Sequence, residues 1–393
     1  MTRAVRVAVV ASHPIQHFCP LYREVARDQR VTLKVFFASD AGARPYFDEG
    51  FGQEVSWGGN LTDGFEHEFL QPGTADIAQA VSTARIDPRL TDFAPDVVQI
   101  YGYADRLARR ALWWSVRHRV PALMVSDSEL VVPRSRVRQL VKRSVLPWIL
   151  KLPTAFLTIG DENESYFHTY GVQRSRLLRS PIPIDSPSLD RLLVDRDVVR
   201  EEERTSWGVS AADVVLLAVG KSIPRKRHRD IVEAVGQLPF EQRAGAVVVL
   251  AGGGGSSDDI QARASELGVR LVLLGFVPVP RLLRSYLGGD VLVHPSEADP
   301  HPLAVAEAVY AGLPVIVSDR VGSWGPTDDV QAGNGLRYPV GDVGRLAGLI
   351  SGWIEDAAAR AGAGAHSTGV GETRRLSRSA STFVDGVLEV AKR

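Results

Sequence analysis

The chain alternates short, β-branched apolar runs with longer amphipathic stretches from one end to the other. This alternation is typical of parallel sheets covered by helices, because a strand buried on both faces is a continuous apolar run and reaches its parallel neighbour through a helical crossover. The pattern therefore predicts an α/β fold throughout. The predicted strands are 5–11, 32–38, 97–101, 122–126, 155–159, 214–219, 246–251, 270–274, 290–294 and 314–318, and predicted helices lie near 20–27, 106–119, 136–150, 162–170 and 374–392.

The length of 393 residues and one change of texture divide the chain into two domains. The stretch 180–213 is rich in Pro and Ser and then in charged residues, without the apolar runs that flank it on either side. We therefore expect each half to build its own sheet. The predicted bounds are 1–185 for the first domain, 186–210 for a linker, 211–371 for the second domain and 372–393 for a final helix, which a glycine-bearing stretch at 361–371 precedes.

Charge and cysteine content exclude several function classes. Lys plus Arg and Asp plus Glu each number 46, so no global field recruits nucleic acid or an acidic membrane, and such a partner would need a local patch. The single cysteine, Cys19, excludes an internal disulfide and a Cys-rich metal cluster. The first apolar run leads into His13 without a cleavage site, and no segment is apolar for the length of a membrane span. These features predict a cytoplasmic protein.

The strongest chemical signal is the segment 294–319, which reads HPSEADPHPLAVAEAVYAGLPVIVSD. A strand ends here in a loop, a helix opens at about Leu303, and Gly312 closes that helix before the next strand. The carboxyl ends of parallel strands and the N-termini of helices bind anions, so a diphosphate would fit this edge. Asp299 and Glu307 can border the same crevice, where carboxylates accept hydrogen bonds from sugar hydroxyls. The alternative is a helix-capping aspartate and a solvated glutamate.

A second signal is the segment 214–235, in which a strand, a glycine, a basic loop and a helix follow one another. Only six residues of the chain are lysine and 40 are arginine, yet Lys221 and Lys226 fall on this single loop. Two mobile ammonium groups at the end of a strand suit a pyrophosphate whose negative charge grows as it leaves. A solvated basic loop is the ordinary alternative, and the anion-binding segment downstream favours the binding site.

Two further strand ends carry glycine. The run 252–255 permits close approach of another backbone, although a plain flexible turn would have the same sequence. Gly275 and Phe276 end the next strand, where they could flank a nucleobase or simply pack in the core. Both positions lie between the two stronger signals, so they are candidates for the same site.

With these motifs the second half resembles the donor domain of the retaining glycosyltransferases of family four, which have the GT-B architecture. The hallmark of that family is an acidic residue, seven intervening residues and a glutamate, which reads D-PHPLAVA-E here, so that Asp299 stands where the family usually has glutamate. A second hallmark is a basic pair after VG, commonly Arg and Lys five residues apart. Here Gly220 precedes Lys221 and Lys226, so that Lys221 stands where the family commonly has arginine. The resemblance is specific over about 214–336 and only general over the first half.

The resemblance implies two Rossmann-like, doubly wound domains that face each other across a cleft, with the acceptor on the first, the donor on the second, and the last helix packed back on the first. It implies transfer of a sugar from a UDP- or GDP-sugar to a hydroxyl acceptor with retention of configuration, without a metal or other cofactor. In physical terms the protein would supply charge stabilisation and alignment.

The resemblance also assigns roles to individual residues. The diphosphate would be bound by Lys221 and Lys226, the ribose by Glu307, and the transferred sugar by Asp299. The rest of the donor site would comprise Gly220, Gly275, Phe276 and His301 together with backbone amides near Pro302 and Leu303.

The first half departs from the family pattern. A glycine-rich first loop is common there, whereas this chain has His13 and His17 directly after the first strand. These histidines could touch the donor phosphate or the acceptor, with His13 as a catalytic candidate, or they could merely cap the sheet. Asp127, at another strand end, is the predicted acceptor contact, with helix capping as its alternative. The loop 41–69, with Trp57, could form an acceptor wall or be an ordinary surface excursion.

One further segment, 133–151, is basic and amphipathic, which is the composition of a membrane-surface helix and would suit a lipid-linked acceptor. The alternative is a solvated helix face in an arginine-rich protein.

Two rival functions also stay open. One is another GT-B enzyme, such as a nucleotide-sugar 2-epimerase or a phosphorylase; the other is a non-catalytic binding protein, which the substitutions at Asp299 and Lys221 would fit. The sequence leaves the acceptor, a cell-surface glycan, lipid-linked molecule or small metabolite, and the oligomeric state open.

Overall fold

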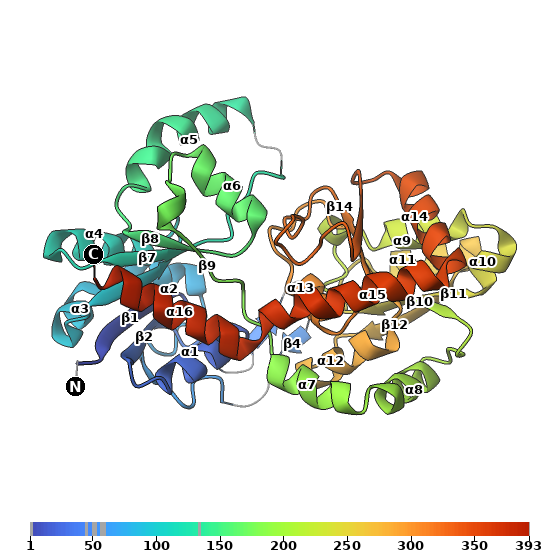
Figure 1. The fold of residues 1–393 in the computed structure, drawn as a ribbon, viewed down its shortest axis with the longest axis horizontal. Helices are drawn as coiled ribbons and strands as arrows, with labels where there is room; N and C mark the ends of the chain where they lie inside the picture. Colours follow the sequence, from blue (N-terminus) through green and yellow to red (C-terminus); the bar gives the residue numbers. More distant parts are fainter. Residues whose placement is uncertain (1–2, 44–45, 49–52, 56–59, 133–134, 393) are drawn as a thin grey trace.

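The computed structural model describes residues 3–43, 46–48, 53–55, 60–132 and 135–392. It has two α/β lobes, each built around one parallel sheet (Figure 1). The α/β fold predicted from the alternating apolar runs is therefore confirmed. The ends of the predicted strands and helices agree with the observed elements to within two residues.

The sheet of the first domain has seven parallel strands, and its central strands are buried on both faces, which explains their continuous apolar runs. The two edge strands of this sheet are not predicted from the sequence, because one is half polar and the other is only three residues long. A short antiparallel pair lies outside the sheet, formed by β3 (Tyr46–Asp48) and β4 (Gln53–Val55). The strand order is β5 (Glu66–Gln71), β2 (Val31–Ser39), β1 (Val5–Ala11), β6 (Val97–Tyr101), β7 (Ala122–Val125), β8 (Ala155–Thr158) and β9 (Leu177–Arg179).

The sheet of the second domain has six strands and is also parallel. Its order is β12 (Arg270–Gly275), β11 (Ala246–Ala251), β10 (Val214–Val219), β13 (Val291–His294), β14 (Val315–Ser318) and β15 (Gly335–Tyr338). In each sheet the direction of strand addition reverses beside its first strand, between β1 and β6 and between β10 and β13. The loops at such a point diverge above and below the sheet, which leaves a crevice at the carboxyl ends of the strands.

Helices cover both faces of each sheet and bury separate apolar cores. None of the described helices combines the length and the apolar character needed to cross a bilayer. In the first domain α1 (Phe18–Ala26) covers one face and α2 (Ile77–Thr83), α3 (Asp87–Phe93), α4 (Arg106–His118), α5 (Arg136–Ile149) and α6 (Asp161–Thr169) lie toward the other. The second domain contains α9 (Arg229–Gly236), α10 (Phe240–Ala244), α11 (Ser257–Leu267), α12 (Val279–Gly288), α13 (Leu303–Tyr310) and α14 (Val343–Glu355). Three short 3-10 turns are η1 (Arg174–Arg176), η2 (Pro224–Lys226) and η3 (Glu372–Arg374).

The stretch 186–210, predicted to be a linker, is instead two helices of the second domain. They are α7 (Ser186–Val194) and α8 (Arg196–Ser206), and both contact α12. Leu189, Val199 and Trp207 are buried in the core of the second domain. The prediction failed because α8 is mostly charged, so its few buried apolar residues do not stand out in the sequence.

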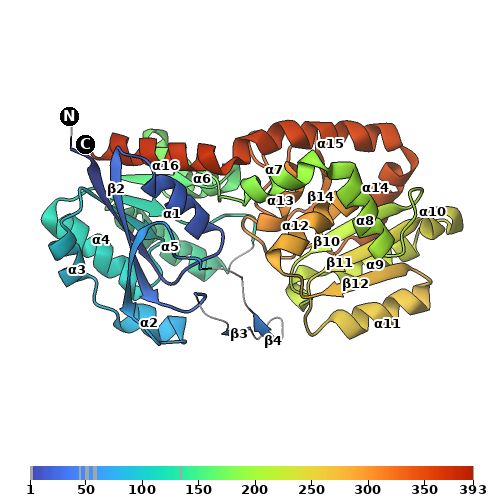
Figure 2. The ribbon, with the colours of Figure 1, turned by 90° about the horizontal axis from the view of Figure 1, so that it is seen from below.

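The end of the chain crosses from the second domain to the first. The glycine-bearing stretch 361–371 does not interrupt the chain; it belongs to α15 (Ala357–Gly371), which packs on α13. Glycine is needed there because a Cβ on Gly364 would lie 2.8 Å from the carbonyl oxygen of Gly312. After η3, α16 (Leu376–Val390) packs beside α1 in the first domain. Figure 2 shows α15 and α16 running end to end along both lobes.

Candidate active site

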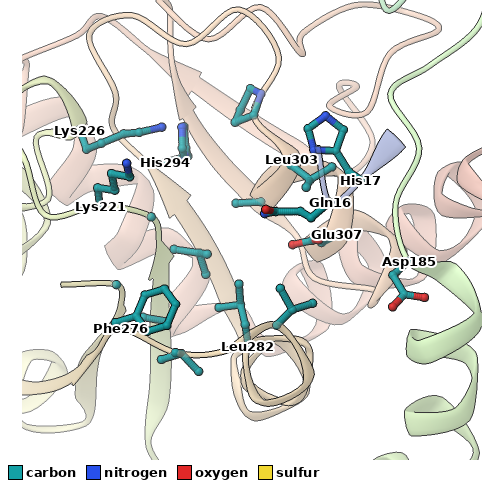
Figure 3. A pocket seen from close by; sticks show the side chains of 18 of the residues that line it. Gln16, His17, Asp185, Lys221, Lys226, Phe276, Leu282, His294, Leu303 and Glu307 are labelled. Atoms are coloured by element: carbon teal, nitrogen blue, oxygen red, sulfur yellow. The ribbon is translucent and has the colours of Figure 1, made fainter. Parts of the chain in front are cut away.

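A cavity of about 1120 Å³ opens between the two domains at the carboxyl edge of the second sheet. Most of its wall comes from the loops that follow β10, β11, β12 and β13, and the first domain contributes Gln16, His17, Pro20 and Leu61. The two switch points therefore face the same space. Of the predicted site residues, those that line the cavity are Gly220, Lys221, Lys226, Phe276, Asp299, His301, Pro302, Leu303 and Glu307 (Figure 3).

The basic end of the cavity is a three-residue cluster. The Lys226 ammonium group is paired with the Asp299 carboxylate, and His294 Nε2 lies 2.9 Å from Asp299 Oδ2. Burial raises the pKa of Asp299, but the His294 hydrogen bond and the charges nearby outweigh it and hold that pKa well below its usual value. Burial lowers the pKa of His294, so this histidine is neutral and donates its Nε2 proton to the carboxylate. The cluster therefore holds one ammonium and one carboxylate at the edge of the cavity.

Lys221 lies on the same loop, between β10 and η2, and Figure 3 shows it beside Lys226 and His294. The glycine run 252–255 brings the next loop against this one, because a Cβ on Gly252 would lie 2.0 Å from the carbonyl oxygen of Gly220. Gly252 also has a φ of 145°, which side chains other than glycine rarely adopt. Close backbone approach, rather than a flexible turn, is thus the role of this run, and it fixes the loop that carries both lysines.

Helix α13 begins at the cavity wall with Leu303, after Pro302 at its N-cap position. The first amides of a helix lack partners within it and carry its partial positive charge, so they favour an anion. Proline has no N–H, so Pro302 itself offers no amide donor, and the phosphate contact of the amides near Pro302 and Leu303 stays a prediction. The donors at this wall begin with Leu303.

Glu307 lies on the first turns of α13 and is buried in the cavity wall. The Tyr286 hydroxyl donates to Glu307 Oε2 at 2.6 Å. Burial raises the pKa of Glu307 to about 7, although the hydrogen bond from Tyr286 lowers it, and the charge of Asp185 adds to the increase. Asp185 also lines the cavity, where its side chain caps α7 by accepting from Ser188 N. Glu307 can therefore change its charge near neutral pH.

The far end of the cavity is apolar. Phe276, Val277, Val279 and Leu282 line it, directly after β12 and along the start of α12. Gly275 does not line the cavity, so its predicted contact with the nucleotide is not supported; its φ of 63° instead turns the chain so that Phe276 reaches the wall. A planar, weakly polar group such as a nucleobase fits this end.

The first domain reaches the cavity through its first loop. Figure 3 shows Gln16 and His17 directed toward Leu303 and Glu307. Burial and the nearby His13 lower the pKa of His17 to about 4, so its ring is neutral at pH 7 and can donate or accept a hydrogen bond. His13 does not line the cavity, and its Nδ1 lies 2.9 Å from Ser12 Oγ. The structure therefore favours His17 over His13 as the histidine that meets a ligand.

Asp127 is exposed in the loop after β7 and does not line the cavity. Asn163 Nδ2 donates to the carbonyl oxygens of Ser126 and Ser128, which holds this loop on α6 and leaves the aspartate side chain in solvent. Its predicted acceptor contact stays a prediction. Trp57, proposed for an acceptor wall, lies outside the described residues, while Leu61 of the same loop lines the cavity.

Behind the cavity His301 joins a buried ionic network. His301 Nε2 lies 2.9 Å from Asp328 Oδ1, and Arg374 of η3 is paired with Asp329. The side chains of His301, Asp328 and Asp329 are close enough to be metal ligands, but the Arg374 guanidinium already supplies positive charge to this group. Burial raises the pKa of Asp328, and the stronger effect of His301 and Arg374 keeps it well below the usual value.

The same Asp328 holds the two domains together. Its Oδ2 accepts a hydrogen bond from Asp161 N at 2.7 Å and so caps the N-terminus of α6 in the first domain. In return, Asp161 Oδ2 accepts from Thr327 N at 2.8 Å. We call Gly160, Asp161, Thr327 and Asp328 the interdomain clasp. Through His301, the clasp is in direct contact with the cavity wall.

Several of these residues escape sequence reasoning. His294 ends a predicted strand, which is a signal that could have identified it. Asp185 is the last residue of the predicted first domain, directly before the expected linker, and Gln16 lies next to the histidine His17 in the sequence. The sequence near Asp161 and Asp328 gives no sign that these two residues are joined by a hydrogen bond.

Residues 199–367 match the model of the family described as glycosyl transferases group 1. This match confirms the predicted resemblance of the second half of the chain to GT-B glycosyltransferases. The chain is 27% identical over 191 residues to the O-antigen chain mannosyltransferase B of Escherichia coli. This alignment covers 48% of each of the two chains. The chain spans about half or less of the length of the curated relatives it matches.

Solved structures support the two-domain GT-B architecture. HepE from Anabaena, solved in complex with UDP, aligns over 98% of this chain and 100% of its own with a TM-score of 0.68 and 17% identity. The UDP-GlcNAc 2-epimerase of Neisseria meningitidis, bound to UDP-GlcNAc, aligns over 98% and 100% with a TM-score of 0.61 and 12% identity. At such identities the likeness concerns the fold alone.

Proposed function

We propose that this protein transfers a sugar from a nucleotide-diphosphate sugar to a hydroxyl acceptor, with retention of anomeric configuration and without a metal ion. The observation that carries the proposal is the anion site at one edge of the second sheet, where Lys221, Lys226 and the start of α13 border a single cavity. The group 1 domain and the bound UDP of the HepE structure support a nucleotide sugar as donor.

In this proposal each part of the cavity takes one part of the donor. The base lies at the apolar end near Phe276, the ribose hydroxyls donate to Glu307, and the diphosphate lies between the lysines and the amide of Leu303. The sugar then extends toward Asp299 and the first-domain loop that carries His17. The assignment rests on the chemistry of the wall, where apolar side chains near Phe276, the Glu307 carboxylate and the two lysines all line the same cavity.

The proposed reaction requires stabilisation of the negative charge that develops on the leaving diphosphate. The bond between the anomeric carbon and the phosphate oxygen breaks, a bond from the acceptor oxygen to the same face of that carbon forms, and the acceptor proton passes to the leaving phosphate. Lys221 and Lys226 stabilise the charge that develops on the diphosphate, which supplies the positive charge that a metal ion would otherwise bring. Closure of the cleft aligns acceptor and donor.

A screen of nucleoside diphosphates tests donor binding. UDP, GDP, ADP and dTDP are each added to the protein, and one of them is expected to raise the melting temperature, because a ligand that binds only the folded state adds about 2.7 kcal/mol of stability at one hundred times its Kd. The Lys226→Met variant should lose most of this shift. If none of the four nucleotides shifts the wild-type protein, the donor site as proposed is wrong.

The epimerase alternative makes a different prediction. When the protein is incubated with the matching nucleotide sugar and no acceptor, a transferase leaves the sugar configuration unchanged at carbon 2. NMR of the recovered nucleotide sugar distinguishes the two cases. An epimerised donor would assign the protein to the epimerases of this fold.

Substituting Glu307 by glutamine is expected to flatten the pH dependence of nucleotide binding. Ribose hydroxyls donate best to an ionised carboxylate, and the pKa of Glu307 is about 7 without ligand. Binding then releases a proton, so affinity rises with pH. Between pH 8 and pH 6 the wild-type affinity should fall about tenfold more than that of the variant, whose only pH dependence comes from the phosphate itself. Calorimetric titration of both proteins measures this, and equal slopes would show that the ribose does not contact Glu307.

A further inference from the structure

Helix α5 carries an apolar stripe that no described part of the protein covers. The stripe residues are 50% to 72% exposed, and their spacing of i, i+3, i+4, i+8 and i+11 places them on one side of the helix. Leu146, on the opposite side, is buried in the core of the first domain. The helix thus has an apolar face toward solvent in addition to its core face. The stripe consists of Val137, Leu140, Val141, Val145 and Trp148.

The charged residues of α5 itself are all basic. The sequence of α5 contains four basic residues and no Asp or Glu, and Lys151 follows directly, in a chain whose basic and acidic residues are equal in number. Arg143 is exposed, and the Lys151 ammonium lies 4.4 Å from the centroid of the Trp148 ring. A tryptophan beside lysine is typical of groups that lie at the boundary between lipid and water. The surface therefore combines an apolar strip with a cationic border.

We propose that this α5 surface docks on a bilayer that contains anionic lipids. An apolar stripe inserts between acyl chains, and cations beside it pair with phosphate headgroups. The stripe therefore suits the hydrocarbon region of the bilayer, and its basic border suits the headgroup region. A protein partner would need an equally apolar strip with an acidic border, and a second copy of this chain would bring cations against cations. The observed charge pattern favours the bilayer.

The loop before α5 also contacts the second domain. Five residues before α5 begins, the carbonyl oxygen of Val131 accepts a hydrogen bond from Arg320 of the second domain at 2.7 Å. Figure 1 shows α5 at the outer edge of the first domain, with no other element over it. If the proposed transfer reaction is correct, a docked bilayer would present a lipid-linked hydroxyl acceptor near the cleft. Membrane docking itself does not depend on that reaction.

Co-sedimentation of the full chain with vesicles tests the proposal. Phosphatidylcholine vesicles with one quarter phosphatidylglycerol should bind the protein, pure phosphatidylcholine vesicles should bind it at least about tenfold more weakly, and 0.5 M salt should remove most of the difference. The double variant Leu140→Glu/Trp148→Glu should lose at least about tenfold in binding. Arg143→Gln and Lys151→Gln should each weaken binding to the anionic vesicles about fivefold.

The matched control is Phe240→Glu. Phe240 is 74% exposed on α10 of the second domain, so this change adds a charge to an exposed apolar position far from α5 and should leave vesicle binding unaltered. Equal binding of the wild type and the Leu140→Glu/Trp148→Glu variant would overturn the proposal. So would a wild-type dimer, seen by light scattering without vesicles, that the double variant abolishes, since a second copy would then occupy the stripe.

The nucleotide thermal shift is measured on the same variants and separates this proposal from the proposed function. Loss of vesicle binding with an unchanged nucleotide shift supports docking through α5. Vesicle binding without any nucleotide shift in the wild type would leave docking in place and contradict the donor site alone.

Discussion

Replacing Lys226 by methionine is expected to lower kcat/KM for sugar transfer by about 10² to 10³, the usual loss when one group that stabilises a developing anion is removed. Methionine keeps most of the side-chain volume and removes the charge. The fold should survive, because His294 still donates to Asp299 after the lysine is gone. Steady-state kinetics with the nucleotide sugar found in the thermal-shift screen measures the effect, and circular dichroism checks the fold.

Two further variants make the result specific. Lys226→Arg keeps the charge and should recover part of the activity. Lys392→Met removes an exposed lysine near the C-terminus and should leave kcat/KM unchanged. An activity within about threefold of wild type in Lys226→Met would mean that the diphosphate is bound elsewhere.

The second large effect is expected from Gly160→Ala in the interdomain clasp. The new Cβ would lie 2.3 Å from Asp328 Oδ2 and 3.0 Å from a carbon of the His301 ring. Gly160 has an extended backbone, with φ −173°, so alanine causes no backbone strain and acts only through this collision. Overpacking of this kind costs about 1–3 kcal/mol. The domains should move apart at the clasp, which lowers the melting temperature by about 2–6 °C and kcat/KM by at least about tenfold, because the cavity needs residues from both sides.

Gly362→Ala is the matched control for the clasp. It lies in α15 with no neighbouring atom within 4 Å of the added Cβ, so the same chemical change should be neutral or slightly stabilising in a helix. Differential scanning calorimetry and kinetics on both variants decide the matter. If Gly160→Ala keeps wild-type activity, the clasp does not set the geometry of the cleft.

The sequence predicts the two sheets because their strands are short apolar runs buried on both faces. The observed bounds of β1, β6, β10 and β11 match the predicted ones. Much of the candidate site is predictable for the same reason. Lys221, Lys226 and Asp299 follow strand ends, and parallel topology brings strand ends to one edge.

The sequence could not predict features that depend on distant partners. Helix α8 owes its position to ion pairs such as Arg204 with Asp290, which no periodic pattern reveals. The clasp joins Asp161 to a residue 167 positions away. The sequence gives no reason to prefer either His13 or His17 as a ligand-binding residue. In the structure His17 directly precedes α1 and lines the cavity, whereas His13 does not.

The crossing of α16 to the first domain has a consequence for biosynthesis. Phe383, Val384 and Val387 fill the core beside β1 and α1, although those elements leave the ribosome hundreds of residues earlier. Of the two domains, the one that is translated earlier is therefore completed later, and its apolar face must wait until α16 has been synthesised. A truncation after α15 would leave that face open to water and to aggregation.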